Sequence, residues 1–108
     1  MLVLFDQGTP IGIRDSLHEH TVRTATEQGW STLLNGQLLR AAEEAGFDVL
    51  LTTDTSLPFQ QNWEGRRLSV VVLAKNRWKL IRRVLPQIAA AISGAKSGSW
   101  TVVEIPET

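Results

Sequence analysis

Short apolar runs that end in polar turns recur along the chain and predict strands buried inside a sheet. Three of these runs contain at most one polar residue, so polar and apolar positions do not alternate in them. Strands without alternation are typical of parallel sheets whose two faces are both covered by helices. Two weaker runs predict further strands, the last of them at an edge of the sheet. The predicted strands cover residues 1–5, 20–25, 47–51, 68–74 and 100–105.

Apolar residues recur at helical spacing between these strands. The clearest case is the stretch with Leu38, Leu39 and Ala42, which lie three and four residues apart on one helix face. We expect Asn35 to cap the start of this helix and Gly46 to cap its end. The predicted helices cover residues 10–18, 36–45 and 77–93, with a short helical turn within residues 55–65.

Pro86 lies inside the last predicted helix and is expected to kink it or split it in two, because a proline inside a helix loses a hydrogen bond and clashes with the preceding turn. Trp30, Leu33 and Leu34 are expected to fold back on the core as a surface flap. Alternating strands and helices favour parallel pairing with right-handed crossovers. The sequence therefore predicts an α/β fold, a three-layer α/β/α sandwich with a mainly parallel sheet of about five strands.

The composition narrows the class of protein. A chain of 108 residues, of which 43% are hydrophobic, fits one soluble globular domain that covers residues 1–108. The absence of cysteine excludes disulfides and thiolate metal sites. The chain begins without the basic and apolar regions of a signal peptide, and no apolar run has the length of a membrane helix. We therefore expect a cytoplasmic protein that does not enter a membrane.

The formal net charge is zero, but the two signs are separated along the chain. Residues 1–65 hold three basic and nine acidic residues, whereas residues 66–108 hold eight basic and two acidic residues. One half could therefore gather cations while the other meets phosphates. The pattern is equally compatible with two halves that pack together and neutralise each other.

Two aspartates that follow predicted strands are the strongest candidates for chemistry. Asp6 ends the first strand and Asp54 follows the third, so neighbouring strands would hold them side by side at one edge of the sheet. Two carboxylates repel each other, and Mg²⁺ or Mn²⁺ bound through oxygen ligands is the simplest compensation. The alternative is that each aspartate caps the turn or helix after its strand.

Other polar residues are weaker candidates. Asn35 could offer an amide oxygen to a cation. Glu43 and Glu44 lie late in an amphipathic helix, where acids usually face solvent. A set of amide and basic residues could contact nucleic acid, although such runs are usually solvated surface. This set comprises Gln60, Asn62, Arg66, Arg67, Lys75 and Arg77.

Four stretches taken together resemble the small PIN-like domain proteins of bacteria, which are related to PIN domain ribonucleases and to VapC toxins. The stretches are LFDQGTP at 4–10, NGQLL at 35–39, FDVLLTTD at 47–54 and FQQN at 59–62. The resemblance covers residues 1–105. It implies an α/β/α sandwich with acids at the carboxyl ends of parallel strands, where they hold a divalent ion for phosphodiester hydrolysis.

By this resemblance, Asp6 and Asp54 are the catalytic acids and metal ligands, with Asn35 as an auxiliary oxygen ligand and Glu44 as a lesser one. Relatives often carry acids at three positions that are neutral here, namely Gln7, Asn35 and Ser56. The resemblance therefore implies one ion rather than two, because two-metal catalysis needs more carboxylates.

The leading functional prediction is a metal-dependent ribonuclease that uses Mg²⁺ or Mn²⁺. Its partners would be RNA and a small antitoxin protein, as in a toxin-antitoxin pair, and similar proteins are commonly homodimers. The alternative is a catalytically weak or inactive PIN-like module that binds RNA or protein. A phosphoacceptor receiver domain also places acids after the first and third strands, but it ranks last because the paired acid after the first strand is missing.

Overall fold

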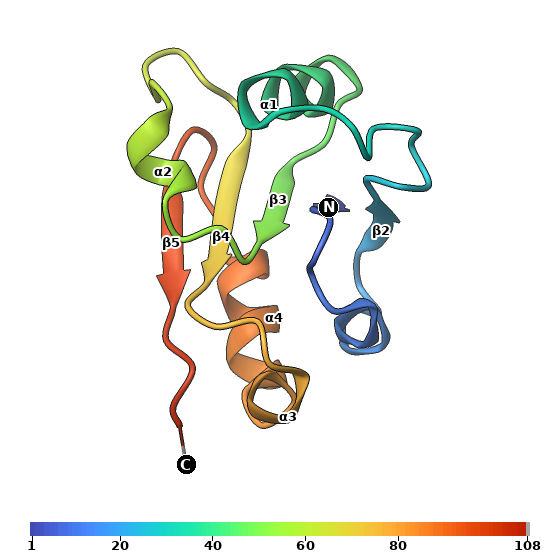
Figure 1. Ribbon diagram of the computed structural model, residues 1–108, viewed down its shortest axis with the longest axis vertical. Coiled ribbons are helices and arrows are strands. Elements are labelled where there is room, and N and C mark those ends of the chain that lie inside the picture. The colour runs from blue at the N-terminus through green and yellow to red at the C-terminus, as the bar shows by residue number, and fades with distance from the viewer. Residues whose placement is uncertain (108) are drawn as a thin grey trace.

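The computed structural model describes residues 1–107 and contains one sheet of five parallel strands in the order β2-β1-β3-β4-β5 (Figure 1). All four neighbouring pairs are parallel. This confirms the predicted α/β fold with a parallel sheet. The strands are β1 Leu2–Phe5, β2 Thr21–Thr24, β3 Val49–Thr52, β4 Ser69–Leu73 and β5 Trp100–Val103.

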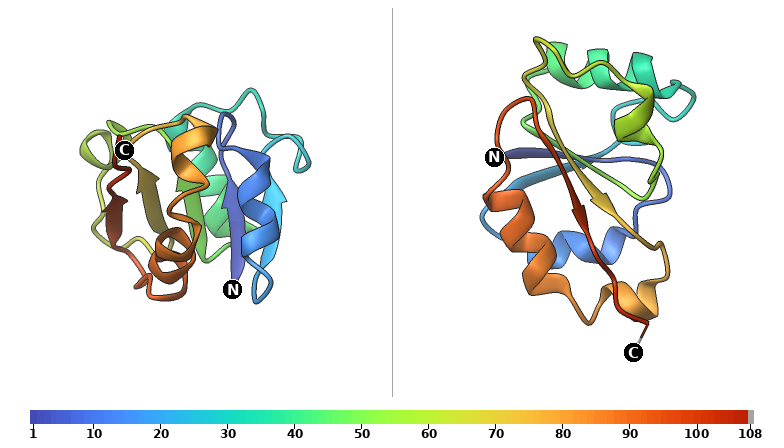
Figure 2. Two further views of the ribbon diagram at one scale, coloured as in Figure 1. Left: turned by 90° about the horizontal axis from the view of Figure 1, so that it is seen from below. Right: turned by 90° about the vertical axis from the view of Figure 1, so that its left-hand side faces the viewer.

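Helices cover both faces of the sheet, which gives three layers (Figure 2). The 3-10 helix η1 and the helices α3 and α4 lie on one face, and α1 and α2 lie on the other. The helices are η1 Ile11–Ser16, α1 Asn35–Glu44, α2 Leu57–Gln60, α3 Trp78–Ile81 and α4 Leu85–Ser93. None of these helices of residues 1–107 is long and apolar enough to cross a membrane.

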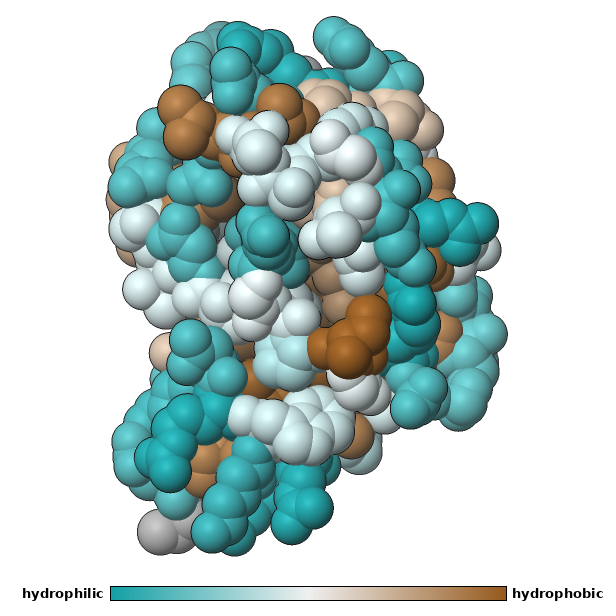
Figure 3. Space-filling view, turned by 45° about the vertical axis from the view of Figure 1, so that its right-hand side comes forward, coloured by the Kyte–Doolittle hydropathy of each residue, from teal (hydrophilic) through white to brown (hydrophobic). Residues whose placement is uncertain are grey.

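Two hydrophobic cores explain why the central strands carry apolar residues on both faces. Successive side chains of a strand point to opposite faces. In β1, Phe5 therefore joins the core beneath η1, α3 and α4, while Leu4 joins the core beneath α1 and α2. In β3, Leu51 and Leu50 divide in the same way, and all four are almost completely buried. On the face shown in Figure 3, apolar side chains emerge only in separate spots among polar ones.

The first helical region differs from its prediction, and the last one divides as predicted. The first helix is a 3-10 helix over Ile11–Ser16 rather than a helix over residues 10–18, and it turns only one residue, Ile13, into the core. It packs closely against α3 in the same layer, because a Cβ atom added to Gly12 would lie 2.6 Å from the ring of Trp78. The last predicted helix is split into α3 and α4, as Pro86 indicated, with the proline in the first turn of α4.

The start of α1 lies one residue earlier than predicted. Leu34 is the N-cap residue, and its N–H donates to Oε1 of Gln37 at 3.0 Å. Asn35 is therefore inside the helix, so the prediction that its side chain caps the helix was wrong. Its amide is free to contact groups outside α1. Of the predicted flap, Trp30 and Leu33 pack against the core, whereas Leu34 is 74% exposed.

Candidate functional site

Asp6 and Asp54 lie at the carboxyl ends of two neighbouring strands, as predicted. Asp6 directly follows β1, and its N–H donates to the carbonyl of Leu51 in β3 at 3.0 Å. Asp54 comes two residues after β3. The chain continues from β1 to β2 on one side and from β3 to β4 on the other, so the strand order reverses between β1 and β3. Open α/β sheets bind their ligands at such a switch point, beyond the carboxyl ends of the strands.

A buried hydroxyl joins the two acids. Oγ1 of Thr52 donates to Oδ2 of Asp6 at 2.8 Å and accepts the N–H of Asp54 at 3.1 Å. Thr52 is completely buried, so its hydroxyl has to find its partners within the chain. Thr52 was not among the predicted site residues. The signal was present, because a hydroxyl residue at the end of an otherwise apolar strand must find a partner when it is buried.

Asp6 lies in the more enclosed environment of the two acids. Burial raises the pKa of its carboxyl group, because the charged form is penalised away from water. The hydrogen bonds from Thr52 and from the N–H of Gln7, at 2.8 Å each, act in the opposite direction, and the negative charge of Asp54 raises the pKa further. The net shift is upward, so Asp6 holds a proton to a higher pH than an ordinary aspartate.

Asp54 is held in its ionised form. The hydroxyl of Ser56 donates to its Oδ1 at 2.6 Å, and the N–H of Ser56 donates to the same oxygen at 3.0 Å. These bonds, with a third from Asn35, lower the pKa of Asp54 although partial burial opposes them. The pKa values of the two acids are therefore shifted apart. In enzymes, such a difference assigns an acid and a base role to a carboxyl pair.

The amide of Asn35 reaches the site from the first turn of α1. Its Nδ2 donates to Oδ2 of Asp54 at 3.0 Å and to Oε1 of Gln60 at 3.3 Å. A carboxylate can only accept, so the amide nitrogen of Asn35 must face Asp54. Asn35 thus lies beside Asp54, as predicted, but it presents a donor there and not the oxygen that was expected to ligate a cation. Gln60, predicted as a nucleic-acid contact, lies in the same group.

The other predicted metal ligand, Glu44, is not brought to the acids. It is the last residue of α1, whereas Asn35 is the first, and nine residues of helix separate them by about 14 Å along the axis. Glu44 is exposed. Its neighbour Glu43 points elsewhere and accepts from Nη1 of Arg66 at 2.7 Å and from the N–H of Arg67 at 2.9 Å.

The predicted basic residues are divided between the two ends of strand β4, and so between the amino-end and the carboxyl-end side of the sheet. Arg66 and Arg67 precede β4, whereas Lys75 and Arg77 follow it, and eight extended residues span roughly 26 Å. Lys75 and Arg77 therefore share the edge of Asp6 and Asp54, with Lys75 paired to Glu107. At the other edge Arg66 is paired with Glu43 and only 16% exposed. Asn62 bonds locally, accepting the N–H of Glu64 at 3.0 Å.

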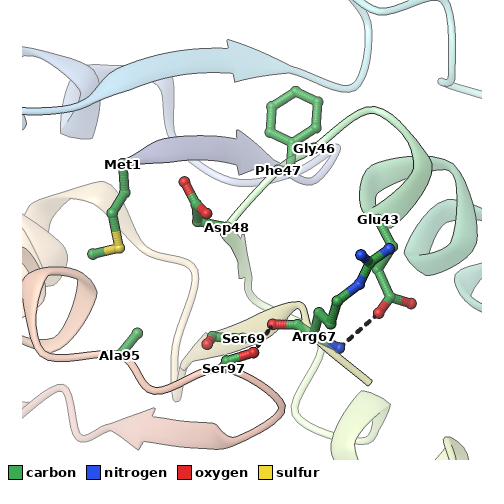
Figure 4. A pocket seen from close by; sticks show the side chains of 9 residues that line it. All are labelled: Met1, Glu43, Gly46, Phe47, Asp48, Arg67, Ser69, Ala95 and Ser97. Carbon is green, nitrogen blue, oxygen red and sulfur yellow. Dashed lines mark hydrogen bonds between the residues drawn. The ribbon is translucent and has the colours of Figure 1, made fainter. Parts of the chain in front are cut away.

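A hollow of about 450 Å³ lies at the amino ends of the strands, whereas the two acids lie at the carboxyl ends (Figure 4). It opens where β3 and β4 begin, and neither Asp6 nor Asp54 lines it. The polar groups around it belong to the structure of that edge, since Asp48 accepts the N–H of Leu2 at 2.8 Å and Ser69 donates to the carbonyl of Lys96 at 2.5 Å. The lining residues are Met1, Glu43, Gly46, Phe47, Asp48, Arg67, Ser69, Ala95 and Ser97.

Among the described residues, two carboxylates, and no larger group of metal-ligating side chains, come together at the carboxyl ends of β1 and β3. Within residues 1–107, no group of three or more His, Cys, Asp or Glu side chains is placed to hold a metal ion. Asp6 and Asp54 are the carboxylates that follow the adjacent strands β1 and β3. Mg²⁺ is commonly bound by one or two carboxylates together with water and substrate phosphates, so two are sufficient for one ion.

The partly buried pair between Glu43 and Arg66 should make stability depend on pH. Burial acts to raise the pKa of Glu43, but the N–H donors of Arg67 and Leu68 and the charge of Arg66 outweigh it and lower the pKa. A lowered folded-state pKa adds stability above the unfolded value of about 4.5, and that stability is lost as the pH falls through the folded value.

We therefore expect Glu43→Gln to unfold more easily at neutral pH, by about 1–3 kcal/mol, because Arg66 loses its partner. The difference in the free energy of unfolding between the variant and the native chain should shrink once the pH is low enough to protonate Glu43. Urea unfolding followed by tryptophan fluorescence at neutral and acidic pH measures both effects. Glu44→Gln is the matched control and should change neither, since Glu44 is exposed. Equal destabilisation at all pH values would contradict the assignment.

The chain matches no protein-family model, no curated protein and no solved structure. The resemblance to PIN-like proteins therefore stays a prediction, and function has to be argued from the geometry of Asp6, Asp54 and their neighbours.

Proposed function

We propose that the chain is a PIN-like hydrolase that cleaves RNA with one divalent cation, Mg²⁺ or Mn²⁺, at Asp6 and Asp54. One observation carries the proposal: two carboxylates stand at the carboxyl ends of adjacent strands, at the point where the strand order reverses, and a buried Thr52 bonds to both residues. Two carboxylates that repel each other do not help the chain to fold, whereas a bound cation would compensate their repulsion.

Two residues around Asp54 prepare it to hold positive charge. Ser56 and Asn35 donate to its two oxygens, so the carboxylate remains ionised and fixed in direction before any ligand arrives. Oδ1 accepts two hydrogen bonds from Ser56 and Oδ2 accepts one from Asn35, so the lone pair that remains for a cation is on Oδ2. A divalent cation, when bound, supplies positive charge for phosphate oxygens and lowers the pKa of water.

Asp6 supplies the second carboxylate for the cation. Its two oxygens accept hydrogen bonds from Gln7 and Thr52, and a bound cation would favour the charged form that burial disfavours. Gln60 and Asn35 offer amide groups beside the acids for ribose or phosphate contacts. Lys75 and Arg77, which follow β4 at the same edge, are the basic residues that we assign to the RNA backbone.

The choice of RNA and of an antitoxin partner rests on the resemblance of the four stretches to PIN-like proteins, whereas a cytoplasmic location is proposed because the chain has no cysteine. The basic second half of the chain supports an anionic substrate. The ion pair of Glu43 with Arg66 already neutralises one positive charge of that half. The proposal therefore assigns RNA contact to the edge of Asp54 and not to Arg66 or Arg67.

Cleavage of single-stranded RNA tests the proposal. We expect the purified chain to cut RNA with Mn²⁺ or Mg²⁺, to stop with a chelator, and to lose at least about 100-fold in rate in Asp54→Asn, as removal of a key electrostatic group does. Glu44→Gln should cleave at the native rate. Cleavage that survives both the chelator and Asp54→Asn would show a contaminating or metal-independent nuclease and would overturn the assignment.

A binding module without turnover is the second candidate function. It is favoured by one observation, that every oxygen of the two carboxylates already accepts a hydrogen bond from the chain itself. A module of this kind would bind RNA without cutting it, and Asp54→Asn would leave its affinity unchanged or tighter, because a negative charge is removed. Measuring binding and cleavage on the same RNA separates the two functions.

A further inference from the structure

Strand β5 is an exposed edge of the sheet that carries no charged residue. Its sequence over Trp100–Val103 is WTVV, and Trp100 and Val102 are each 38% exposed. The opposite edge strand, β2, carries the exposed Arg23. Soluble proteins usually protect edge strands with charges, proline or a covering segment, since an open edge pairs with other strands. The unprotected edge is therefore β5.

The free main-chain groups of this edge belong to Trp100 and Val102. The carbonyls of Ser99 and Val103 accept the N–H groups of Val70 and Ala74 at 3.0 and 3.1 Å, so they face β4. Main-chain groups alternate in direction along a strand of a parallel ladder. Thr101 therefore also faces β4, and Trp100 and Val102 direct their N–H and C=O groups away from it. Trp100 and Val102 thus present donors and acceptors to any strand that approaches from outside.

An apolar surface accompanies these groups. Phe59 of α2 is 76% exposed and meets Trp100 edge to face, with ring centroids 5.4 Å apart. Val102 lies two residues from Trp100 and shares its face of the sheet. We call Phe59, Trp100 and Val102 the edge patch.

We propose that β5 pairs antiparallel with β5 of a second copy of this chain, and that this forms a homodimer with a continuous sheet. With the twofold axis at Thr101, each Trp100 lies opposite Val102 of the second copy. These are the residues with outward main-chain groups, so each such pair can exchange two hydrogen bonds. An aromatic residue opposite a β-branched one is also a favourable cross-strand pair.

Charge complementarity favours a second copy over an unrelated peptide. Antiparallel pairing brings the start of one strand beside the end of the other. Lys96 precedes β5 and Glu104 directly follows it, and both are exposed. Within residues 1–107 neither side chain belongs to an ion pair. In the dimer, Lys96 of each copy approaches Glu104 of the other, so the contact repeats about the twofold axis and closes.

Sedimentation over a range of protein concentrations tests the dimer with the full chain. We expect a reversible equilibrium of monomer and dimer in the native chain. Val102→Pro should weaken dimerisation by about 100-fold or more, since both copies lose an outward donor and the edge is blocked. The fold should survive, because proline is tolerated on an edge strand where its nitrogen faces solvent. Thr21→Lys on the other edge is the control and should dimerise normally.

The charge pair gives an independent test if Val102→Pro lowers the circular dichroism of the fold. Lys96→Glu and Glu104→Lys should each weaken the dimer, and the double variant should recover it. A native chain that is monomeric at every concentration would overturn the proposal, and so would a dimer that tolerates both kinds of variant. Open-ended polymers would also overturn it, because they would indicate pairing of β5 with β2. None of these outcomes depends on a cation or on RNA cleavage.

Discussion

Replacing Asn35 by aspartate is expected to raise the affinity for Mn²⁺ by about tenfold or more, because affinity for hard cations grows with the number of charged oxygen ligands. The side chain of Asn35 already lies 3.0 Å from Asp54, so the new carboxylate would enter the site without a change in the backbone. Isothermal titration of Mn²⁺ into the native chain and the variant measures the difference.

The same substitution should destabilise the chain when no cation is present. Asp54 would lose the donor on its Oδ2 and gain a negative neighbour, which we expect to cost about 1–3 kcal/mol. Urea unfolding with and without Mn²⁺ should therefore show a larger stabilisation by the cation in Asn35→Asp than in the native chain. Asn35→Ala, the control, loses the donor without adding an acid and should not bind Mn²⁺ more tightly. If Asn35→Asp binds no better than this control, Asn35 does not border a cation site.

Thr52→Val is expected to destabilise the fold by about 2–3 kcal/mol even though valine has nearly the same shape. The N–H of Asp54 would be buried without an acceptor, and the carboxylate of Asp6 would lose a donor. The pKa of Asp6 should rise further, since the hydrogen bond from Thr52 opposes the effect of burial. Urea unfolding and an NMR titration of the Asp6 carboxyl group measure the two effects.

Thr52→Ser is the matched variant for this test. It keeps the hydroxyl and removes only a methyl group, so it should hold the pKa of Asp6 near its native value and cost about 1 kcal/mol. If the valine and serine variants unfold alike and leave the same pKa, the hydroxyl does not link the two acids in the way we describe.

The strands were predictable because the runs of apolar residues reflect burial on two faces. Leu4 and Phe5 enter different cores, and so do Leu50 and Leu51, which explains why apolar residues follow one another directly in β1 and β3. The position of Asp6 beside the end of β3 followed from that prediction once the strands were taken as neighbours. The 3-10 form of η1 was not predictable, since it depends on the contact of Gly12 with Trp78, a residue far along the chain.

The neighbours of the two acids were harder to predict, for two physical reasons. Asn35 was expected to cap α1, but the N-cap residue is Leu34, so Asn35 lies in the first turn of the helix and its side chain reaches Asp54. The other reason is the length of a strand. Arg67 and Lys75 are close in the sequence, yet they lie at opposite ends of β4 and therefore cannot contact the same site.

A titration of the native chain with Mn²⁺, compared with Asp6→Asn, tests the central claim most directly. The claim is that Asp6 and Asp54 hold one hard cation at the reversal of strand order. We expect the native chain to bind one Mn²⁺ and Asp6→Asn to bind it at least about tenfold more weakly, because one of two charged ligands is gone. No binding by the native chain at millimolar Mn²⁺, or equal binding by both, would contradict the claim.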